Sequence, residues 1–341
     1  MRATMLMLTA VAALAVGCAG SDEDSGQDTK PAPKALSQPD LVALGRKSTV
    51  RLDAKLVDAK ISGSGAVIDA ERGLVLSNAH VVTGASAISA LVGDEKVSAR
   101  VEASAPCEDL AVLALDPIPD NLSALEFGST EALREGERVT ALGYPKIPGQ
   151  SSKLTATDGN LAAKGVSITI DETTPKYSAL LQHQATINAG SSGGPLVNSA
   201  GKLVGLNTIG ASGEVQDTSY AIDGDYIQDV LPDIKAGKDK ANPGWFDYPV
   251  SLVDELEEFE GIDLGPLPAS KGLLILGTGG GSPADRAGFN GGDIVLTMED
   301  TSVEDIEDKC EILRSRGSGS TVKVAGISVN GNSFNRRLKL R

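Results

Sequence analysis

The chain is poor in aromatic residues, cysteine and histidine. Of its 341 residues, only 3% are aromatic, three are cysteine and two are histidine. Metal sites built from nitrogen and sulfur ligands need clusters of Cys and His, and this sequence has none. We therefore expect neither a metal nor a cofactor. The scarcity of aromatic side chains also leaves little material of the kind that dominates protein interfaces.

Positive charge is also in short supply. The chain has 46 Asp and Glu against 31 Lys and Arg, a formal net charge of −15. Proteins that bind nucleic acid present a cationic surface that displaces counterions, so this balance argues against such a partner. Beyond the first residues, no apolar run is long enough to cross a bilayer.

The N-terminus reads as an export signal. Arg2 precedes a short apolar stretch that ends in Ala15–Cys18, a pattern similar to a bacterial lipobox. This predicts a lipoprotein signal peptide over residues 1–17 and lipidation of Cys18. The alternative is an ordinary secretory signal with a chance cysteine. Residues 18–40 then form a disordered tether, because residues 19–34 lack aromatic and branched apolar side chains. Ala19 favours the outer membrane if the host has two.

The body of the chain predicts two small β-barrels. Short β-rich runs separated by turn residues form two blocks of similar length, each with about six strands. The first block contains runs at 48–57, 62–69, 73–82, 87–93 and 109–115, and the second contains runs at 138–145, 153–163, 165–171, 179–187, 195–210 and 219–223. A helix follows over Asp225–Lys235, which Pro232 should interrupt or kink. We assign these elements to one domain over residues 41–240.

Residues 241–341 have a different texture, with strands and two helices mixed. Ser282 caps a short helix that Gly288 closes, and Ser302 caps a longer one that ends near Gly317. Cys310 lies on the apolar stripe of the longer helix, which favours a small core residue. Export also permits a Cys107–Cys310 disulfide, and the sequence leaves both possibilities open.

Three residues suit the requirements of serine hydrolysis. This chemistry needs a base, a carboxylate that orients the base, and amide donors for the oxyanion. His80 ends an apolar strand-like run, Asp109 opens the next strong strand, and Ser192 lies in the run "GSSGGP". The other histidine, His183, is too close to the serines to be the base and fits a surface or barrel position. The alternative for "GSSGGP" is a simple hairpin turn.

Together these motifs resemble the HtrA/Deg family of trypsin-like serine proteases. The resemblance rests on "SGSGAVIDAERGLVLSNAHVV", "DLAVLAL", "RVTALGYP" and "INAGSSGGPLVNSAGKLVGLNT". It implies a mostly β fold, a chymotrypsin-like double β-barrel, with Ser192 as nucleophile, His80 as base and Asp109 as orienting acid. The backbone around Gly190, Ser191 and Ser192 would form the oxyanion hole, with the N–H groups of Gly190 and Ser192 as donors.

The resemblance also implies a substrate pocket. Thr186 would lie near its base, and the strand Leu206, Asn207 and Thr208 would line it and pair with the substrate backbone. Because Thr186 is uncharged, small or medium apolar side chains are expected; the alternative is that Thr186 only packs in the barrel. The chain departs from the family at Ser191, where the family has asparagine, and at 183–184 and 189.

The tail resembles a PDZ domain in "KGLLILGTGGGSPADRAGFNGGDIVLTMED". Such α+β domains capture chain ends by adding a strand beside a helix, here about Val303–Arg316. The segment Gly244–Val250 lacks the glycine usual in the carboxylate loop. This module therefore either binds a C-terminal peptide or serves as a rigid aid to assembly.

These observations predict an ATP-independent serine endopeptidase that cleaves unfolded or damaged proteins. We expect it in the cell envelope, lipid-anchored on the periplasmic side of a bacterial membrane, and the family implies a homotrimer. The alternative is a latent or non-proteolytic protein that acts as a chaperone or stress sensor through its PDZ-like domain.

Overall fold

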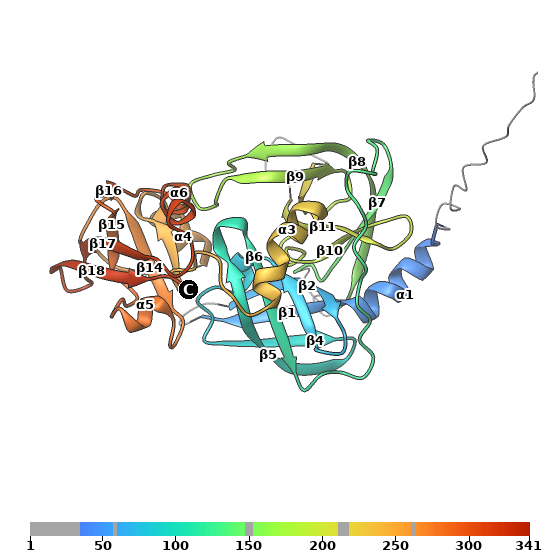
Figure 1. Cartoon of the computed structure of the whole chain (residues 1–341), viewed down its shortest axis with the longest axis horizontal. Helices are drawn as coiled ribbons and strands as arrows, with labels where there is room; N and C mark the ends of the chain where they lie inside the picture. Colours follow the sequence, from blue (N-terminus) through green and yellow to red (C-terminus); the bar gives the residue numbers. More distant parts are fainter. Residues whose placement is uncertain (1–34, 57–59, 147–152, 211–217, 261–262) are drawn as a thin grey trace, which may run out of the picture. The chain divides into compact units, whose positions relative to one another are not determined.

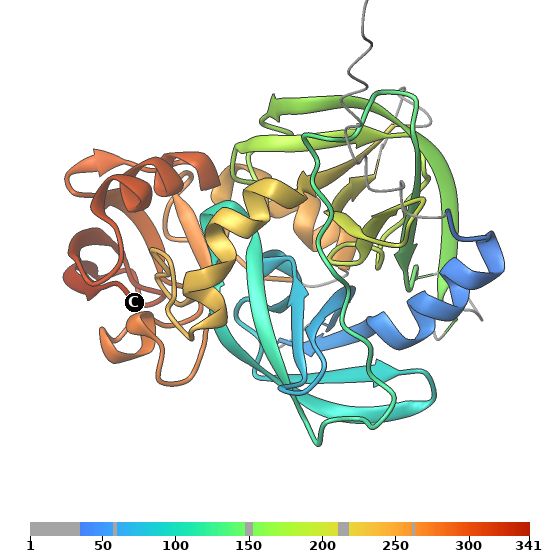
Figure 2. The ribbon, with the colours of Figure 1, turned by 45° about the vertical axis from the view of Figure 1, so that its right-hand side comes forward.

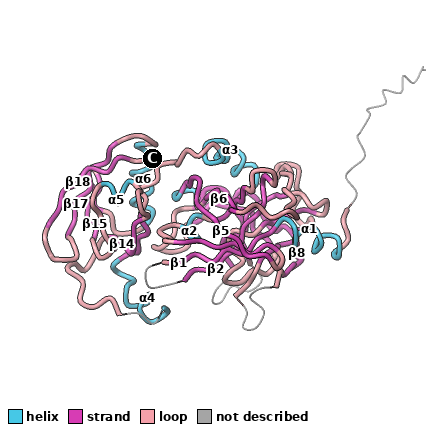
Figure 3. The backbone as a smooth tube through the Cα atoms, turned by 90° about the horizontal axis from the view of Figure 1, so that it is seen from below, coloured by secondary structure: helices cyan, strands magenta, loops and turns pink. Residues whose placement is uncertain are grey.

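The computed structural model describes residues 35–56, 60–146, 153–210, 218–260 and 263–341. The predicted signal peptide, the lipidation site at Cys18 and most of the predicted tether lie outside these ranges. Residues 35–341 form one compact unit. Strands dominate it, with short helices between them (Figure 3). Among the helices of the described residues, none has the length and apolar character of a membrane span.

The first barrel is closed and entirely antiparallel, in the strand order β1-β2-β3-β6-β5-β4. Helix α1 leads into it, α2 follows β3, and the 3₁₀ turn η1 precedes β6 (Figure 1). The elements are α1 Gln38–Ser48, β1 Thr49–Lys55, β2 Lys60–Asp69, β3 Leu74–Ser77, α2 Ala79–Val82, β4 Ala87–Val92, β5 Glu95–Ala105, η1 Pro106–Glu108 and β6 Leu110–Asp116.

The second barrel repeats this design in the order β10-β11-β12-β9-β8-β7, also closed and antiparallel. Helix α3 follows β12 and packs against β5 and β6 of the first barrel and β11 of the second (Figures 1 and 2). The elements are β7 Arg138–Gly143, β8 Thr155–Ile168, β9 Tyr177–His183, β10 Pro195–Asn198, β11 Leu203–Gly210, β12 Ser219–Asp223 and α3 Gly224–Lys235.

The C-terminal residues form a separate antiparallel sheet in the order β13-β14-β15-β17-β18, with β16 paired to β15. Its apolar residues form a core of their own around Trp245, Phe289 and Leu313. The elements are β13 Trp245–Pro249, η2 Val250–Leu252, α4 Val253–Glu260, β14 Leu273–Thr278, α5 Pro283–Arg286, β15 Ile294–Met298, β16 Thr301–Ser302, α6 Ile306–Arg316, β17 Thr321–Ile327 and β18 Ser333–Lys339.

The mostly β fold with two barrels is confirmed, but several local predictions differ. Helix α1 begins at Gln38, inside the predicted tether, because Ser37 and Asp40 form a reciprocal capping box. Helix α6 begins at Ile306 rather than after Ser302, since Asp305 supplies its N-cap. Helix α3 runs through Pro232, which lies in its last turn.

Cys107 and Cys310 form a disulfide, with their Cα atoms 5.4 Å apart. It joins η1 of the first barrel to α6 of the C-terminal sheet, across a sequence separation of 203 residues. Both side chains are also buried in the C-terminal core, so Cys310 is at once a disulfide partner and a small core residue. The guanidinium of Arg314 on α6 donates to the backbone carbonyl of Cys107 at 2.7 Å and reinforces the same junction.

We predict that the Cys107→Ala/Cys310→Ala double variant loses about 2–4 kcal/mol of unfolding free energy, because the unfolded chain regains the freedom that the crosslink removes. Urea unfolding at pH 7.5 measures this loss. Reduction of the natural protein should reproduce it, and the double variant should not respond to reductant. Equal midpoints for the natural and double-variant proteins would show that the crosslink contributes nothing.

His183 is fully buried in the second barrel on β9. Within the described residues, neither ring nitrogen makes a hydrogen bond of standard geometry. Burial lowers the pKa of His183 to about 4, and the backbone of Ala185 offsets only part of this effect. Between about pH 6.5 and 4 the unfolded chain therefore binds a proton that the folded barrel excludes, and stability falls as the pH falls through this window.

We predict that His183→Leu removes this acid sensitivity. Between pH 7.5 and 5 the natural protein should lose about 2 kcal/mol more than the variant, a figure that follows from the lowered pKa. Urea midpoints of both proteins at the two pH values test this. The same pH dependence in both would show that His183 is not the responsible group.

Candidate active site

Asp109 carries a buried carboxylate at the junction of the two barrels. It follows η1 in a left-handed conformation, with φ of 54°, and is 2% exposed. One oxygen, Oδ1, accepts the backbone N–H of His80 at 3.0 Å. Both oxygens face His80 Nδ1, at 3.0 Å for Oδ1 and 2.9 Å for Oδ2. A buried charge is tolerated only with such partners, and these fix the imidazole orientation.

His80 lies on the short helix α2, not at the end of the strand that precedes it. Its side chain is 44% exposed while its carboxylate partner is buried, so one edge of the ring faces outward. Burial lowers the pKa of His80, but the charge and hydrogen bond of Asp109 outweigh this, and the net pKa lies above 6.5. With Nδ1 held by Asp109, the other ring nitrogen is left for proton transfer.

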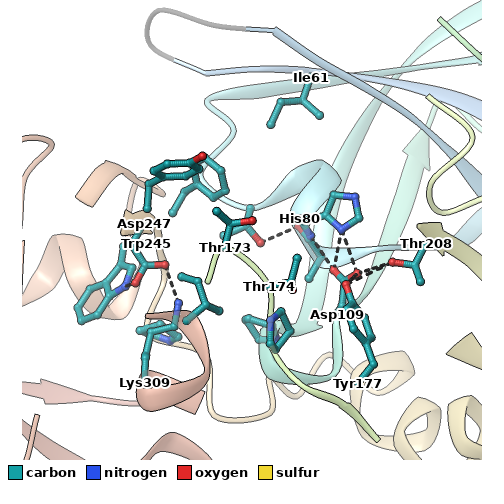
Figure 4. Close-up of a pocket in the computed structure, with 18 residues that line it drawn as sticks. Ile61, His80, Asp109, Thr173, Thr174, Tyr177, Thr208, Trp245, Asp247 and Lys309 are labelled. Atoms are coloured by element: carbon teal, nitrogen blue, oxygen red, sulfur yellow. Dashed lines mark hydrogen bonds and ion pairs between the residues drawn. The ribbon is translucent and has the colours of Figure 1, made fainter. Parts of the chain in front are cut away.

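Two residues from the second barrel complete the shell of Asp109. The Tyr177 hydroxyl donates to Oδ2 at 2.9 Å, and the Thr208 hydroxyl donates to the same oxygen at 3.1 Å (Figure 4). Tyr177 opens β9 and Thr208 lies on β11, and both are buried. Burial and the nearby Asp109 carboxylate raise the pKa of Tyr177 well above 10, which keeps it a donor. No motif surrounds Tyr177 in the sequence, so its role there was not predicted.

Ser192 lies on the turn that enters β10. Its hydroxyl donates to the backbone carbonyl of Thr208 at 2.9 Å, and within the described residues no hydrogen bond joins it to His80. The peptide group that follows it is held in place, since Ser64 N–H donates to the Ser192 carbonyl at 2.8 Å. The next residue, Gly193, has φ of +83°, and a Cβ there would lie 2.2 Å from the Ser64 carbonyl oxygen. Only glycine fits this close approach.

The amides of Gly190 and Ser192 are available. Within the described residues, neither N–H has a hydrogen-bond partner, whereas the Ser191 amide donates to the Asn188 carbonyl at 2.8 Å. The Ser64 hydroxyl donates to the Gly190 carbonyl at 2.7 Å, which turns that peptide unit. Free backbone donors beside a serine are the arrangement that an oxyanion hole needs.

The residues predicted to form one substrate pocket lie in different places in the structure. Thr186 lines a cavity of about 120 Å³ together with Ser191, whereas Thr208 lines a larger one together with His80. Leu206 is buried in the hydrophobic core. The Asn207 side chain donates to the carbonyls of Gly194 and Pro195, at 3.0 and 3.1 Å, and so supports the serine turn. Among the described residues, no group of His, Cys, Asp and Glu is arranged to hold a metal.

We predict that Asp109→Asn lowers the pKa of His80 from above 6.5 to below it, because Asp109 supplies the effects that raise it and burial alone remains. Imidazole resonances followed by NMR against pH measure this directly, since the chain has only two histidines. His183 serves as the internal control and should keep its low pKa. An unchanged His80 pKa would contradict the pairing.

Known proteins that resemble the chain agree with this geometry. Residues 63–206 match the model of the trypsin-like peptidase domain. The chain is 30% identical over 294 residues to the serine protease Do-like HtrA of Bacillus subtilis, with 82% of this chain and 63% of the relative covered. It is 32% identical over 251 residues to a probable periplasmic serine endoprotease DegP-like of Hahella chejuensis, with 72% and 50% covered. It thus spans about half to two thirds of these relatives.

Solved structures resemble the chain over a larger share of its length than these relatives do. The structure of the HtrA-type protease AlgW with tripeptide is 27% identical, with a TM-score of 0.53, and 89% of this chain and 97% of that chain are covered. The chain is therefore similar to trypsin-like peptidases over residues 63–206, and to the HtrA and DegP serine proteases over most of its length.

Proposed function

We propose that the chain is a serine endopeptidase that cleaves polypeptides through Ser192, His80 and Asp109. The observation that carries this proposal is the buried, fully paired Asp109 carboxylate, which orients a half-exposed imidazole, together with the free amides of Gly190 and Ser192. Orienting acid, base and oxyanion donors are the parts that acyl transfer requires.

The reaction proceeds in two displacements. The Ser192 oxygen attacks the peptide carbonyl carbon while its proton passes to the outward nitrogen of His80, and the amides of Gly190 and Ser192 stabilise the oxyanion. The same proton then passes to the departing amine as the C–N bond breaks. Water, deprotonated by His80, hydrolyses the acyl-enzyme and restores the serine. The Ser192 hydroxyl must first leave the Thr208 carbonyl and turn towards His80.

The substrates and location follow from the same resemblance. The relatives include probable periplasmic endoproteases and a protease solved with a bound peptide, which supports polypeptide substrates and an envelope location for this chain. We propose that the substrates are unfolded or damaged proteins. The Ala15–Cys18 motif supports export and lipid anchoring at Cys18. Assembly into a homotrimer stays a prediction.

The C-terminal sheet supports a PDZ-like module with an unusual groove. In such modules a peptide would lie between β13 and α6. Here the Lys309 ammonium on α6 meets the Asp247 carboxylate on β13 at 2.6 Å, and both side chains are buried. A peptide entering between these elements would have to break this ion pair. The module therefore suits a structural role better than capture of chain ends.

One observation favours a latent form as the second candidate. Because the Ser192 hydroxyl is bonded to Thr208, the base is not engaged with the nucleophile in this arrangement. A protein held in this state would bind polypeptides without cleaving them. Protection of an aggregating client by the Ser192→Ala variant would support such a binding role.

We predict that Ser192→Ala abolishes labelling by a fluorophosphonate and lowers peptide turnover on the order of 10⁶-fold. Labelling of the natural protein should fall as the pH falls through the His80 pKa, because protonated imidazole cannot accept the serine proton. Gel fluorescence measures the labelling. Ser199→Ala, an exposed serine in the next turn, is the matched control and should label normally.

Mass mapping of the labelled peptide tests which serine of the motif reacts. A label on Ser191 instead of Ser192 would overturn the assignment of the nucleophile. Absence of labelling in the natural protein, also with an unfolded client present, would overturn the proposed activity.

A further inference from the structure

A cavity of about 320 Å³ lies directly beside His80 (Figure 4). Ile61 and His80 from the first barrel and the segment 173–175 before β9 form two of its walls. The C-terminal residues contribute β13, at residues 245–248, and helix α6, at Ile306 and Lys309. The cavity is at the small end of the range for binding pockets, which suits one large side chain.

The wall formed by β13 is held firmly against the first barrel. Gly84, two residues after α2, has φ of +75°, and a Cβ there would lie 2.7 Å from Phe246 Cβ. This glycine lets the aromatic residue approach the turn that follows α2, the helix that carries His80. The Cys107–Cys310 disulfide and the bond from Arg314 to the Cys107 carbonyl fix the same two parts together.

The lining of the cavity is largely apolar, and its two carboxylates, Asp109 and Asp247, already have partners. The Asp247 carboxylate is paired with Lys309 at 2.6 Å and also accepts the Trp245 indole N–H at 2.8 Å. Asp109 is satisfied within the triad. The rest of the lining includes the apolar or largely apolar residues Ile61, Pro106, Pro175, Pro243, Phe246 and Tyr248. A charged guest would lose its hydration without gaining a counter-ion, whereas an apolar guest gains from burial.

The position of the cavity relates it to the reaction. A general base must come within about 3 Å of the hydroxyl from which it takes the proton. A polypeptide with its carbonyl at Ser192 would therefore pass the imidazole of His80, which also lines the cavity. Because β13 lines the same cavity, a side chain that entered it from the polypeptide would contact the C-terminal sheet.

We propose that this cavity, walled jointly by the first barrel and β13, is a specificity site for a bulky apolar side chain of the polypeptide substrate. This inference rests on the proposed endopeptidase function and adds to it the class of side chain that is recognised. Phe246 of the C-terminal sheet and Ile61 of the first barrel are the specificity-determining residues, because both are apolar and line the same space from different parts of the fold.

The test uses internally quenched peptides in which each position around the cleaved bond carries in turn Phe, Leu, Ser or Asp. The natural protein should prefer Phe or Leu over Asp at one position by at least about tenfold in kcat/KM, as expected for filling an apolar pocket. Phe246→Ala should reduce this preference about tenfold. Ile61→Trp, which fills the cavity, should reject Phe at that position while it still accepts Ser.

Titration of each preparation with diisopropyl fluorophosphate gives the concentration of competent enzyme, so a selectivity ratio does not depend on the folded fraction. Val329→Ala, an exposed apolar residue of the C-terminal sheet outside the cavity lining, should keep the natural ratio. If the natural protein reacts with the probe but shows no apolar preference, or if both cavity variants keep its ratio, the specificity site is overturned and the proposed function stands. If the natural protein neither reacts nor cleaves, both fail.

Discussion

The negative charge of Asp109 is the constraint on which the site depends. A carboxylate that is 2% exposed needs several donors, and it finds them on α2, β9 and β11. The last two belong to the second barrel, so pairing this charge requires the two barrels to meet at this point. The imidazole of His80 gains its orientation and its raised pKa from the same contact. The contact between the two barrels therefore also sets the orientation and the raised pKa of His80.

The C-terminal sheet is tied to this junction rather than attached at a distance. Cys107 precedes Asp109 by two residues and is bonded to α6, while Phe246 packs on the Gly84 backbone beyond α2. The two segments that carry Asp109 and His80 thus each contact the C-terminal sheet. A displacement of that sheet would therefore act directly on the segments that hold these two residues.

The sequence predicted much of the fold, and its errors have physical causes. Alternating apolar runs correctly indicated two barrels, since burial on one face imposes a period of two. The first barrel's β5 was missed because charged and half-exposed residues hide its alternation. Two predicted strands merged into the long β8, where register shifts let one strand bend. The N-cap of α6 is Asp305 rather than the predicted Ser302, because Asp305 forms a reciprocal capping box with Asp308.

The sequence by itself determined the residues that we propose for the chemistry: a rare histidine, an aspartate before a buried strand and a serine among glycines are patterns that local sequence can show. Only the tertiary structure decided what surrounds them. Tyr177 supports Asp109 from 68 residues away, and Cys310 reaches Cys107 across 203. The Ser192 hydroxyl bonds Thr208, and Phe246 forms a wall beside His80. These contacts depend on how barrels and sheet pack, and packing between distant segments leaves no periodic trace in a single sequence.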